Sequence, residues 1–185
     1  MQKNIKELSK LITLFFFLFT YSLDAQNKFV GVKSCGTCHK AKKIGNQLKV
    51  WKNSSHANAY KTLQTEKADK IALEKGFKTK AVETPECLKC HITGFEIDKS
   101  MFKKKFKIED GVQCESCHGA GSKYKKKKIM KNHVKAVANG LTEYKDDASI
   151  EKQCRTCHNE ESPTFKEFDF KKRWKEIAHP LPTKG

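Results

Sequence analysis

The sequence is short of acidic residues: 21 Asp and Glu stand against 38 Lys and Arg in 185 residues, a formal net charge of +17. It lacks an apolar run long enough to cross a bilayer, which needs about 20 residues. It has no cysteine outside one repeated motif, and no other internal repeat. It also has no recognition helix or RNA-binding motif, so we expect no nucleic acid as a partner despite the positive charge.

The first 25 residues have the pattern of an export signal. Lys3, Lys6 and Lys10 precede the apolar stretch 11–19, and Ala25 offers a small residue for cleavage. We predict a signal peptide over residues 1–25 and a periplasmic domain over residues 26–185, with no spanning segment after cleavage. The alternative is an uncleaved membrane anchor, which the charged and polar residues at both ends of the stretch disfavour.

All eight cysteines belong to four Cys-x-x-Cys-His motifs. This motif is the attachment signature of c-type haem: two thiols one helical turn apart bind the porphyrin, and the following imidazole ligates its iron. We therefore predict four covalently bound haems. The predicted attachment residues are Cys35 and Cys38, Cys87 and Cys90, Cys114 and Cys117, and Cys154 and Cys157. The predicted proximal iron ligands are His39, His91, His118 and His158.

Three other uses of the cysteines explain the pattern less well. Four disulfides give no reason for a histidine after every pair. Two four-cysteine zinc sites also leave the histidines unexplained, and zinc ribbons belong mostly to cytosolic proteins. Redox dithiols of the thioredoxin type occur singly, near a βαβ pattern.

The chain is short for the number of haems that it is predicted to hold. About 160 residues follow the predicted leader, which suggests a single domain with about 40 residues for each haem. The haems must therefore form most of the core, and their propionates offset about half of the positive charge. We predict one mainly α domain with much irregular loop and little or no sheet.

Helix signals divide the chain into short segments. We predict that the helix of the first motif continues over residues 40–51 and that residues 123–138 form a basic helix. Asp169 should cap a last helix over residues 170–178. Phenylalanines interleaved with lysines over residues 92–111 indicate a loop or a short hairpin.

The remaining histidines limit the iron chemistry. Four of the seven histidines are proximal, and of three methionines only Met101 and Met130 lie outside the leader. We therefore predict that His56, His133 and His179 are distal iron ligands. Three distal histidines for four irons leave one haem five-coordinate or water-ligated.

The sequence resembles the cytochrome c-554 family of tetrahaem periplasmic electron carriers across essentially the whole mature chain. The matching segments are Trp51-Lys-Asn-Ser-Ser-His-Ala-Asn-Ala59, Cys90-His-Ile-Thr-Gly-Phe95, Gly111-Val-Gln-Cys-Glu-Ser-Cys-His-Gly-Ala-Gly121 and Phe165-Lys-Glu-Phe-Asp-Phe170 before His179. The resemblance implies three bis-histidine haems and one high-spin haem. His133 would then ligate the first iron, His179 the third and His56 the fourth. His91 would be the sole protein ligand of the second iron.

These features predict an exported electron carrier, not an enzyme, which transfers electrons between redox partner proteins in a respiratory or nitrogen-compound pathway. One alternative is a haem enzyme, for example for nitric oxide or nitrite reduction, at the open iron. Polar groups converging over the distal face of the His91 haem would favour it. The other is an electron-transfer subunit of a larger cytochrome complex, including one at a membrane. A large exposed apolar patch would favour that role.

Two dense lysine runs, residues 103–107 and 123–128, flank the third motif. Side chains at successive helix positions point around the circumference, so most of these charges must face water. A face that only keeps the protein soluble is the simpler interpretation of one such run. With two runs beside one haem, we predict instead a positive field that steers an acidic redox partner.

Overall fold

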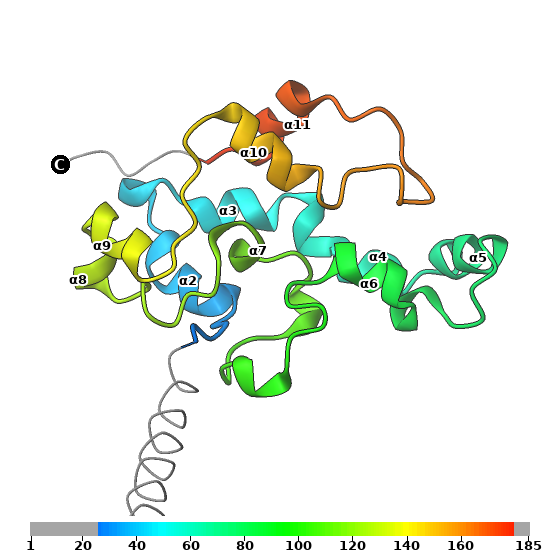
Figure 1. Cartoon of the computed structure of the whole chain (residues 1–185), viewed down its shortest axis with the longest axis horizontal. Coiled ribbons are helices and arrows are strands. Elements are labelled where there is room, and N and C mark those ends of the chain that lie inside the picture. The colour runs from blue at the N-terminus through cyan, green and yellow to red at the C-terminus, as the bar shows by residue number, and fades with distance from the viewer. Residues whose placement is uncertain (1–25, 180–185) are drawn as a thin grey trace, which may run out of the picture.

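A computed structural model describes residues 26–179 of the chain (Figure 1). The predicted signal peptide, residues 1–25, lies outside the described residues. Within residues 26–179, no helix has both the length and the apolar character that crossing a membrane requires.

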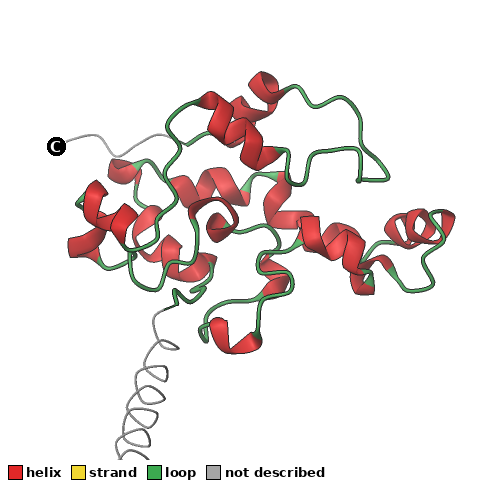
Figure 2. Cartoon of the chain, in the orientation of Figure 1, coloured by secondary structure: helices red, strands yellow, loops and turns green. Residues whose placement is uncertain are grey.

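Short helices joined by loops make up the described residues, in agreement with the predicted mainly α class (Figure 2). Their single β-type pairing is an isolated bridge between Phe29 and Phe102. The α-helices are α2 (Val32–His39), α3 (Gln47–Lys52), α4 (Ala59–Leu63), α5 (Glu66–Glu74), α6 (Pro85–His91), α7 (Cys114–His118), α8 (Lys127–Met130), α9 (His133–Ala138), α10 (Asp147–Cys154) and α11 (Phe170–Ile177). The 3-10 turns are η2 (Lys42–Ile44), η3 (Ser55–Asn58), η4 (Ala81–Glu83), η5 (Lys99–Met101) and η6 (Ile108–Asp110).

Local chain breakers explain why two predicted helices are shorter than expected. Gly45, with a φ of 97°, separates α2 from α3, so the helix predicted over residues 40–51 is interrupted. Asn132 caps α9 through its side chain and divides the helix predicted over residues 123–138 into α8 and α9. The cap predicted at Asp169 is confirmed, because its carboxylate accepts a hydrogen bond from the amide three residues later at 3.0 Å.

Residues 92–111 form a loop with two 3-10 turns and no hairpin. The rings of Phe102 and Phe106 stack with centroids 4.3 Å apart, and Phe29 packs edge-on against both at 5.8 and 5.9 Å. This aromatic cluster fastens the loop to the segment that leads into α2.

The hydrophobic core made by side chains is small. Ten hydrophobic residues are buried in the described part of the chain, and three of them are alanines. One cluster, Leu63 with Ala72 and Ala81, lies in a lobe of α4, α5 and α6 at the right of Figure 1, away from α2, α8 and α9. This core is small for a domain of this length. Its small size fits the expectation that porphyrins supply most of the buried apolar surface.

Candidate haem-binding site

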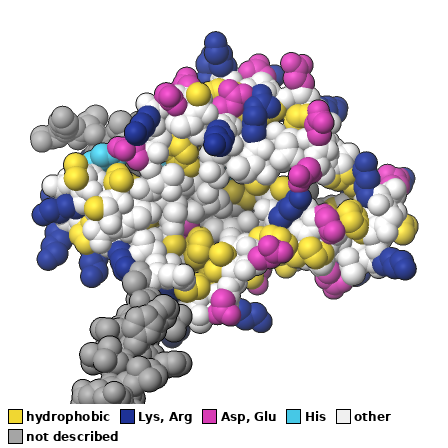
Figure 3. Space-filling view, viewed as in Figure 1, with side chains coloured by type: hydrophobic (Ala, Val, Ile, Leu, Met, Phe, Trp, Pro, Cys, Tyr) yellow, Lys and Arg dark blue, Asp and Glu magenta, His cyan; other side chains and the backbone are white. Residues whose placement is uncertain are grey.

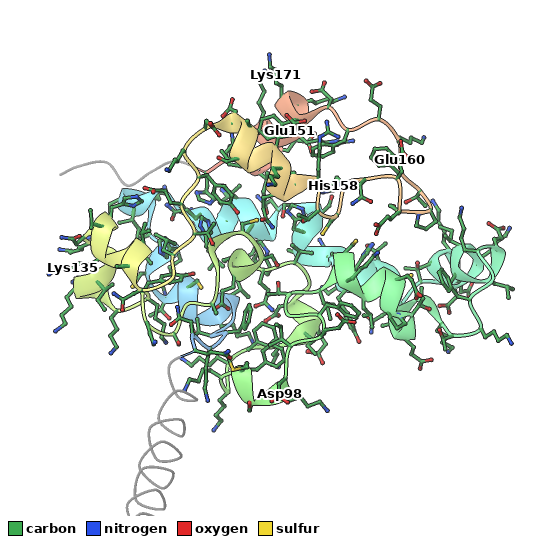
Figure 4. All side chains as sticks on the ribbon, in the orientation of Figure 1. Asp98, Lys135, Glu151, His158, Glu160 and Lys171 are labelled. Atoms are coloured by element: carbon green, nitrogen blue, oxygen red, sulfur yellow. The ribbon has the colours of Figure 1, made fainter. Side chains whose placement is uncertain are left out.

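Three of the four predicted proximal histidines stand at helix ends. His39, His91 and His118 are the last residues of α2, α6 and α7. His158 lies just beyond α10 (Figure 4), and its amide still donates to the Cys154 carbonyl at 3.0 Å, as within a helix. Each motif thus places its imidazole one turn from the first thiol. None of the eight cysteines forms a disulfide, so every thiol is available for a thioether bond.

Two pairs of histidine rings lie at a distance that fits one iron between them. The ring centroids of His56 and His158 are 6.0 Å apart, and those of His118 and His179 are 5.8 Å apart. With metal–nitrogen bonds of about 2.0 Å on both sides, two axial imidazoles have centroids roughly 6 Å apart. The fold therefore brings two predicted distal ligands to two predicted proximal ones.

Porphyrin nitrogens suit these pairs better than further protein ligands do. Within residues 26–179, no group of three or more His, Cys, Asp or Glu side chains is arranged to hold a metal ion. The porphyrin of a bound haem would supply the other ligands of an iron between two imidazoles. The paired rings, the free thiols and the small core all fit haem c.

Hydrogen bonds orient the other two proximal rings. Nδ1 of His91 lies 2.8 Å from the carbonyl oxygen of Ala59. Since a carbonyl can only accept, Nδ1 donates and Nε2 is left as a neutral ligand, which is usual for metal-binding histidine. Nδ1 of His39 lies 3.1 Å from Oε1 of Gln47, which permits the same tautomer.

His133 is placed differently from the other predicted distal ligands. Its side chain, at the start of α9, is 65% exposed, and its Nε2 lies 2.6 Å from Oε1 of Glu143. No ring contact joins it to His39 within the described residues. Glu143 leaves Nδ1 as the available ring nitrogen.

Burial favours the neutral form of the paired imidazoles. It lowers the pKa of His118 to about 4, reinforced by the charges of His179 and His39. Burial also lowers the pKa of His56, His158 and His179. Neutral imidazole is the form that binds metal, so these rings are ready to ligate iron at neutral pH.

Interactions between thiols show which motifs are neighbours. Four interacting pairs join different motifs: Cys35 with Cys114, Cys117 with both Cys154 and Cys157, and Cys90 with Cys157. The hydrogen bond to Cys114 raises the pKa of Cys35, and burial raises the pKa of Cys117 and of Cys90 to about 11. The first motif therefore lies next to the third, the third next to the fourth, and the fourth next to the second.

Two buried polar side chains in and beside the third motif are not among the predicted site residues. Glu115, 3% exposed, accepts hydrogen bonds from the amides of Val30 at 2.9 Å and Gly31 at 2.8 Å. Gln113, 2% exposed, accepts one from the amide of Val32 at 2.8 Å. The one signal in the sequence was an acidic residue between the two cysteines, which the other three motifs lack.

Comparison with known proteins agrees with this site. Residues 34–119, which include the first three motifs, match the family described as cytochrome c554 and c-prime. The cytochrome c-554 of Nitrosomonas europaea is 31% identical over 159 residues, covering 74% of this chain. The match spans 60% of the length of that relative. No solved structure matches the chain with comparable significance.

The helix-ending motifs, the paired imidazoles and these matches together define a c-type cytochrome. The chain belongs to the cytochrome c-554 family. Membership of this family implies covalently bound haem c.

Proposed function

We propose that the mature chain, residues 26–185, is a periplasmic tetrahaem cytochrome that carries electrons between redox partner proteins. The observation that carries this proposal is the placing of two histidine pairs, at 6.0 and 5.8 Å, beside two of the four motifs. Bound haem supplies one-electron chemistry at iron; the polypeptide holds the iron ligands, orients them and fixes the order of the sites. The resemblance to the family supports a respiratory or nitrogen-compound pathway.

The proposed ligand sets follow the order of the motifs. They are His39 with His133 for the first iron, His91 alone for the second, His118 with His179 for the third, and His158 with His56 for the fourth. The paired rings support the third and fourth sets. For the first, we propose that Nδ1 of His133 binds the iron while Glu143 holds Nε2, because metal-bound imidazoles often pair their other nitrogen with a carboxylate.

A relay needs fixed distances between its sites, and side-chain contacts between motifs supply them. Nε2 of Gln153, in α10, donates to the carbonyl of Ser116 in the third motif at 3.2 Å. Lys89 of the second motif forms an ion pair with Glu161, which follows the fourth. With the thiol pairs, these contacts support a linear path in the order first, third, fourth and second haem.

Intact mass spectrometry of protein produced with a c-type haem maturation system tests the proposal. The mass should exceed that of the polypeptide from residue 26 by four haems, and Cys154→Ala with Cys157→Ala should lower the count to three. The family match ends before this fourth motif, so the double variant tests a haem that the match does not include. Bound zinc without covalent haem, or a wild-type count below four, would overturn the proposal.

A further inference from the structure

The two lysine runs lie on either side of the segment that leads into the first motif. The amide of Lys103 donates to the carbonyl of Phe29 at 2.8 Å, and the amide of Ser122 donates to the carbonyl of Lys28 at 3.0 Å. The runs flank the third motif in sequence, as noted above. Backbone hydrogen bonds also tie both runs to residues 28 and 29, which precede α2, the helix of the first motif.

Seven lysines of these runs form what we call the basic face. All seven are exposed, and none forms an ion pair within residues 26–179. They are Lys103, Lys104, Lys105, Lys125, Lys126, Lys127 and Lys128. The cost of holding so many like charges together is not relieved by partners inside the fold, so an external anion can gain from them.

Two long stretches of the chain beside the basic face contain no acidic residue. Residues 26–65 contain eight lysines and no acidic residue, and residues 116–142 contain seven lysines and none. The acidic residues near the runs are few: Glu96, Asp98 and Glu109 are exposed, Asp110 is half-buried, and Glu115 is buried with its carboxylate held by backbone amides. Figure 3 shows basic side chains gathered at the end of α8 and α9, and Lys135 is labelled there in Figure 4.

The first motif follows directly after the segment to which both lysine runs are bonded. Cys38 is exposed, as is Cys117 of the third motif, so both attachment points lie at the surface. In the contact order of the motifs, the first has one neighbour, the third, so it stands at an end of the relay. An end site is where a relay must exchange electrons with another protein.

We propose that the basic face is the docking site of an acidic redox protein, and that one electron at a time passes between that protein and the first haem. The inference rests on the proposed electron-carrier function and adds the surface and the partner's chemistry. No bond is made or broken in the step. The electron that the reduced partner loses is gained by a ferric haem.

Stopped-flow reduction by reduced plant-type ferredoxin, an acidic one-electron protein, tests the docking site. The test variant carries Lys103→Gln, Lys105→Gln, Lys125→Gln and Lys127→Gln. The control carries four substitutions in and after α5, where the lysines are also exposed: Lys67→Gln, Lys75→Gln, Lys78→Gln and Lys80→Gln. Both lower the net charge equally. At low salt we expect the test variant to react about tenfold more slowly and the control less than about twofold, with the difference fading at high salt.

Equal slowing of both variants would mean a response to net charge alone and would overturn the docking site. So would an unchanged ferredoxin rate with lost binding to phosphatidylglycerol vesicles, which would make the face a membrane surface. Carbodiimide cross-linking of the wild type to ferredoxin gives a second measurement, independent of variant folding. Cross-links at basic-face lysines support the proposal, and cross-links confined to the α5 lysines overturn it.

The haem count separates this inference from the proposed function. Both variants should carry four haems and be fully reduced by dithionite. If both variants carry four haems but their reduction rates do not depend on the basic face, the docking site is wrong and the proposed electron-carrier function still stands. A wild-type count below four haems would overturn the proposed function itself.

Discussion

The carboxylate of Glu115, inside the third motif, accepts a hydrogen bond of 2.8 Å from the amide of Gly31, the N-cap residue of α2. The first amides of a helix have no partner within the helix, and Gly31 has no side chain with which to cap them. Gln113 accepts from the next amide, that of Val32. The third motif therefore caps the helix that carries the first motif and fixes the spacing of the two sites.

We predict that Glu115→Gln destabilises the holoprotein. The new amide group turns a donor toward backbone donors, so at least one buried amide loses its acceptor, which costs about 1–3 kcal/mol. Urea unfolding followed by circular dichroism measures the loss. The exposed Glu109→Gln, which removes the same charge, should change the free energy of unfolding by less than about 0.5 kcal/mol. Equal effects of the two substitutions would contradict the capping role.

Alanine at each proposed distal histidine should convert one low-spin haem to high spin, because one strong axial ligand is lost. Electron paramagnetic resonance and visible spectra of the His56→Ala, His179→Ala and His133→Ala proteins measure this. Asn58→Ala, an exposed change in the same turn as His56, is the control and should leave the spectra unchanged. A variant with a wild-type spectrum would remove its histidine from the ligand set.

The features that sequence predicted well depend on neighbouring residues. The haem attachment motifs and the Asp169 cap are set by residues within one helical turn. The breaks at Gly45 and Asn132 were missed because the spacing of apolar residues continues across them, whereas the backbone does not. Gly45 adopts a left-handed conformation. The Asn132 side chain accepts a hydrogen bond from the amide of Lys135 in α9, so a new helix begins there.

Long-range relationships were beyond the reach of local patterns. The pairing of His56 with His158 brings η3 close to the segment that follows α10, about 100 residues later, and only the family resemblance suggested it. The burial of Glu115 could not be foreseen, since acidic residues are seldom buried without a partner. One of its donors is the nearby amide of Gly121, but the others are the amides of Val30 and Gly31, more than 80 residues earlier, which no sequence spacing indicates.

The stability of α10, the helix of the fourth motif, should decrease in acid because its N-cap is a carboxylate. Asp146 accepts a hydrogen bond from the amide of Ser149 at 2.8 Å, and this bond holds the pKa of Asp146 below its usual range. The folded state therefore binds the proton less readily than the unfolded state. The stabilisation is present at neutral pH and is lost as the pH falls through the folded pKa.

Asp146→Ala should accordingly lower the urea midpoint of unfolding at pH 7. The difference from wild type should shrink as the pH falls below about 3.9, the ordinary pKa of aspartate. Asp147→Ala is the control, because it removes a neighbouring charge and leaves the cap in place. A deficit that stays constant with pH would show that the Asp146 carboxylate charge does not matter.

Gly31 and Gly76 both have a positive φ, 80° and 84°, so a side chain at either residue is strained. Gly31, with a ψ of 153°, also lies in a region that essentially only glycine adopts. A Cβ on Gly31 would lie 2.7 Å from the carbonyl oxygen of Lys105 and from the Cα of Phe106, whereas one on Gly76 would have no atom within 4 Å.

Gly76→Ala should therefore cost about 1–2 kcal/mol of unfolding free energy, the penalty of the left-handed conformation alone. Gly31→Ala should cost about 1–3 kcal/mol more, because the backbone of residues 105 and 106 must move away. That movement would shift one lysine run relative to α2, so Gly31→Ala should also slow reduction by ferredoxin while Gly76→Ala should not. Urea unfolding and stopped-flow measurements on proteins with equal haem content compare them. Equal losses of stability would mean that the segment before α2 is not held tightly against this run.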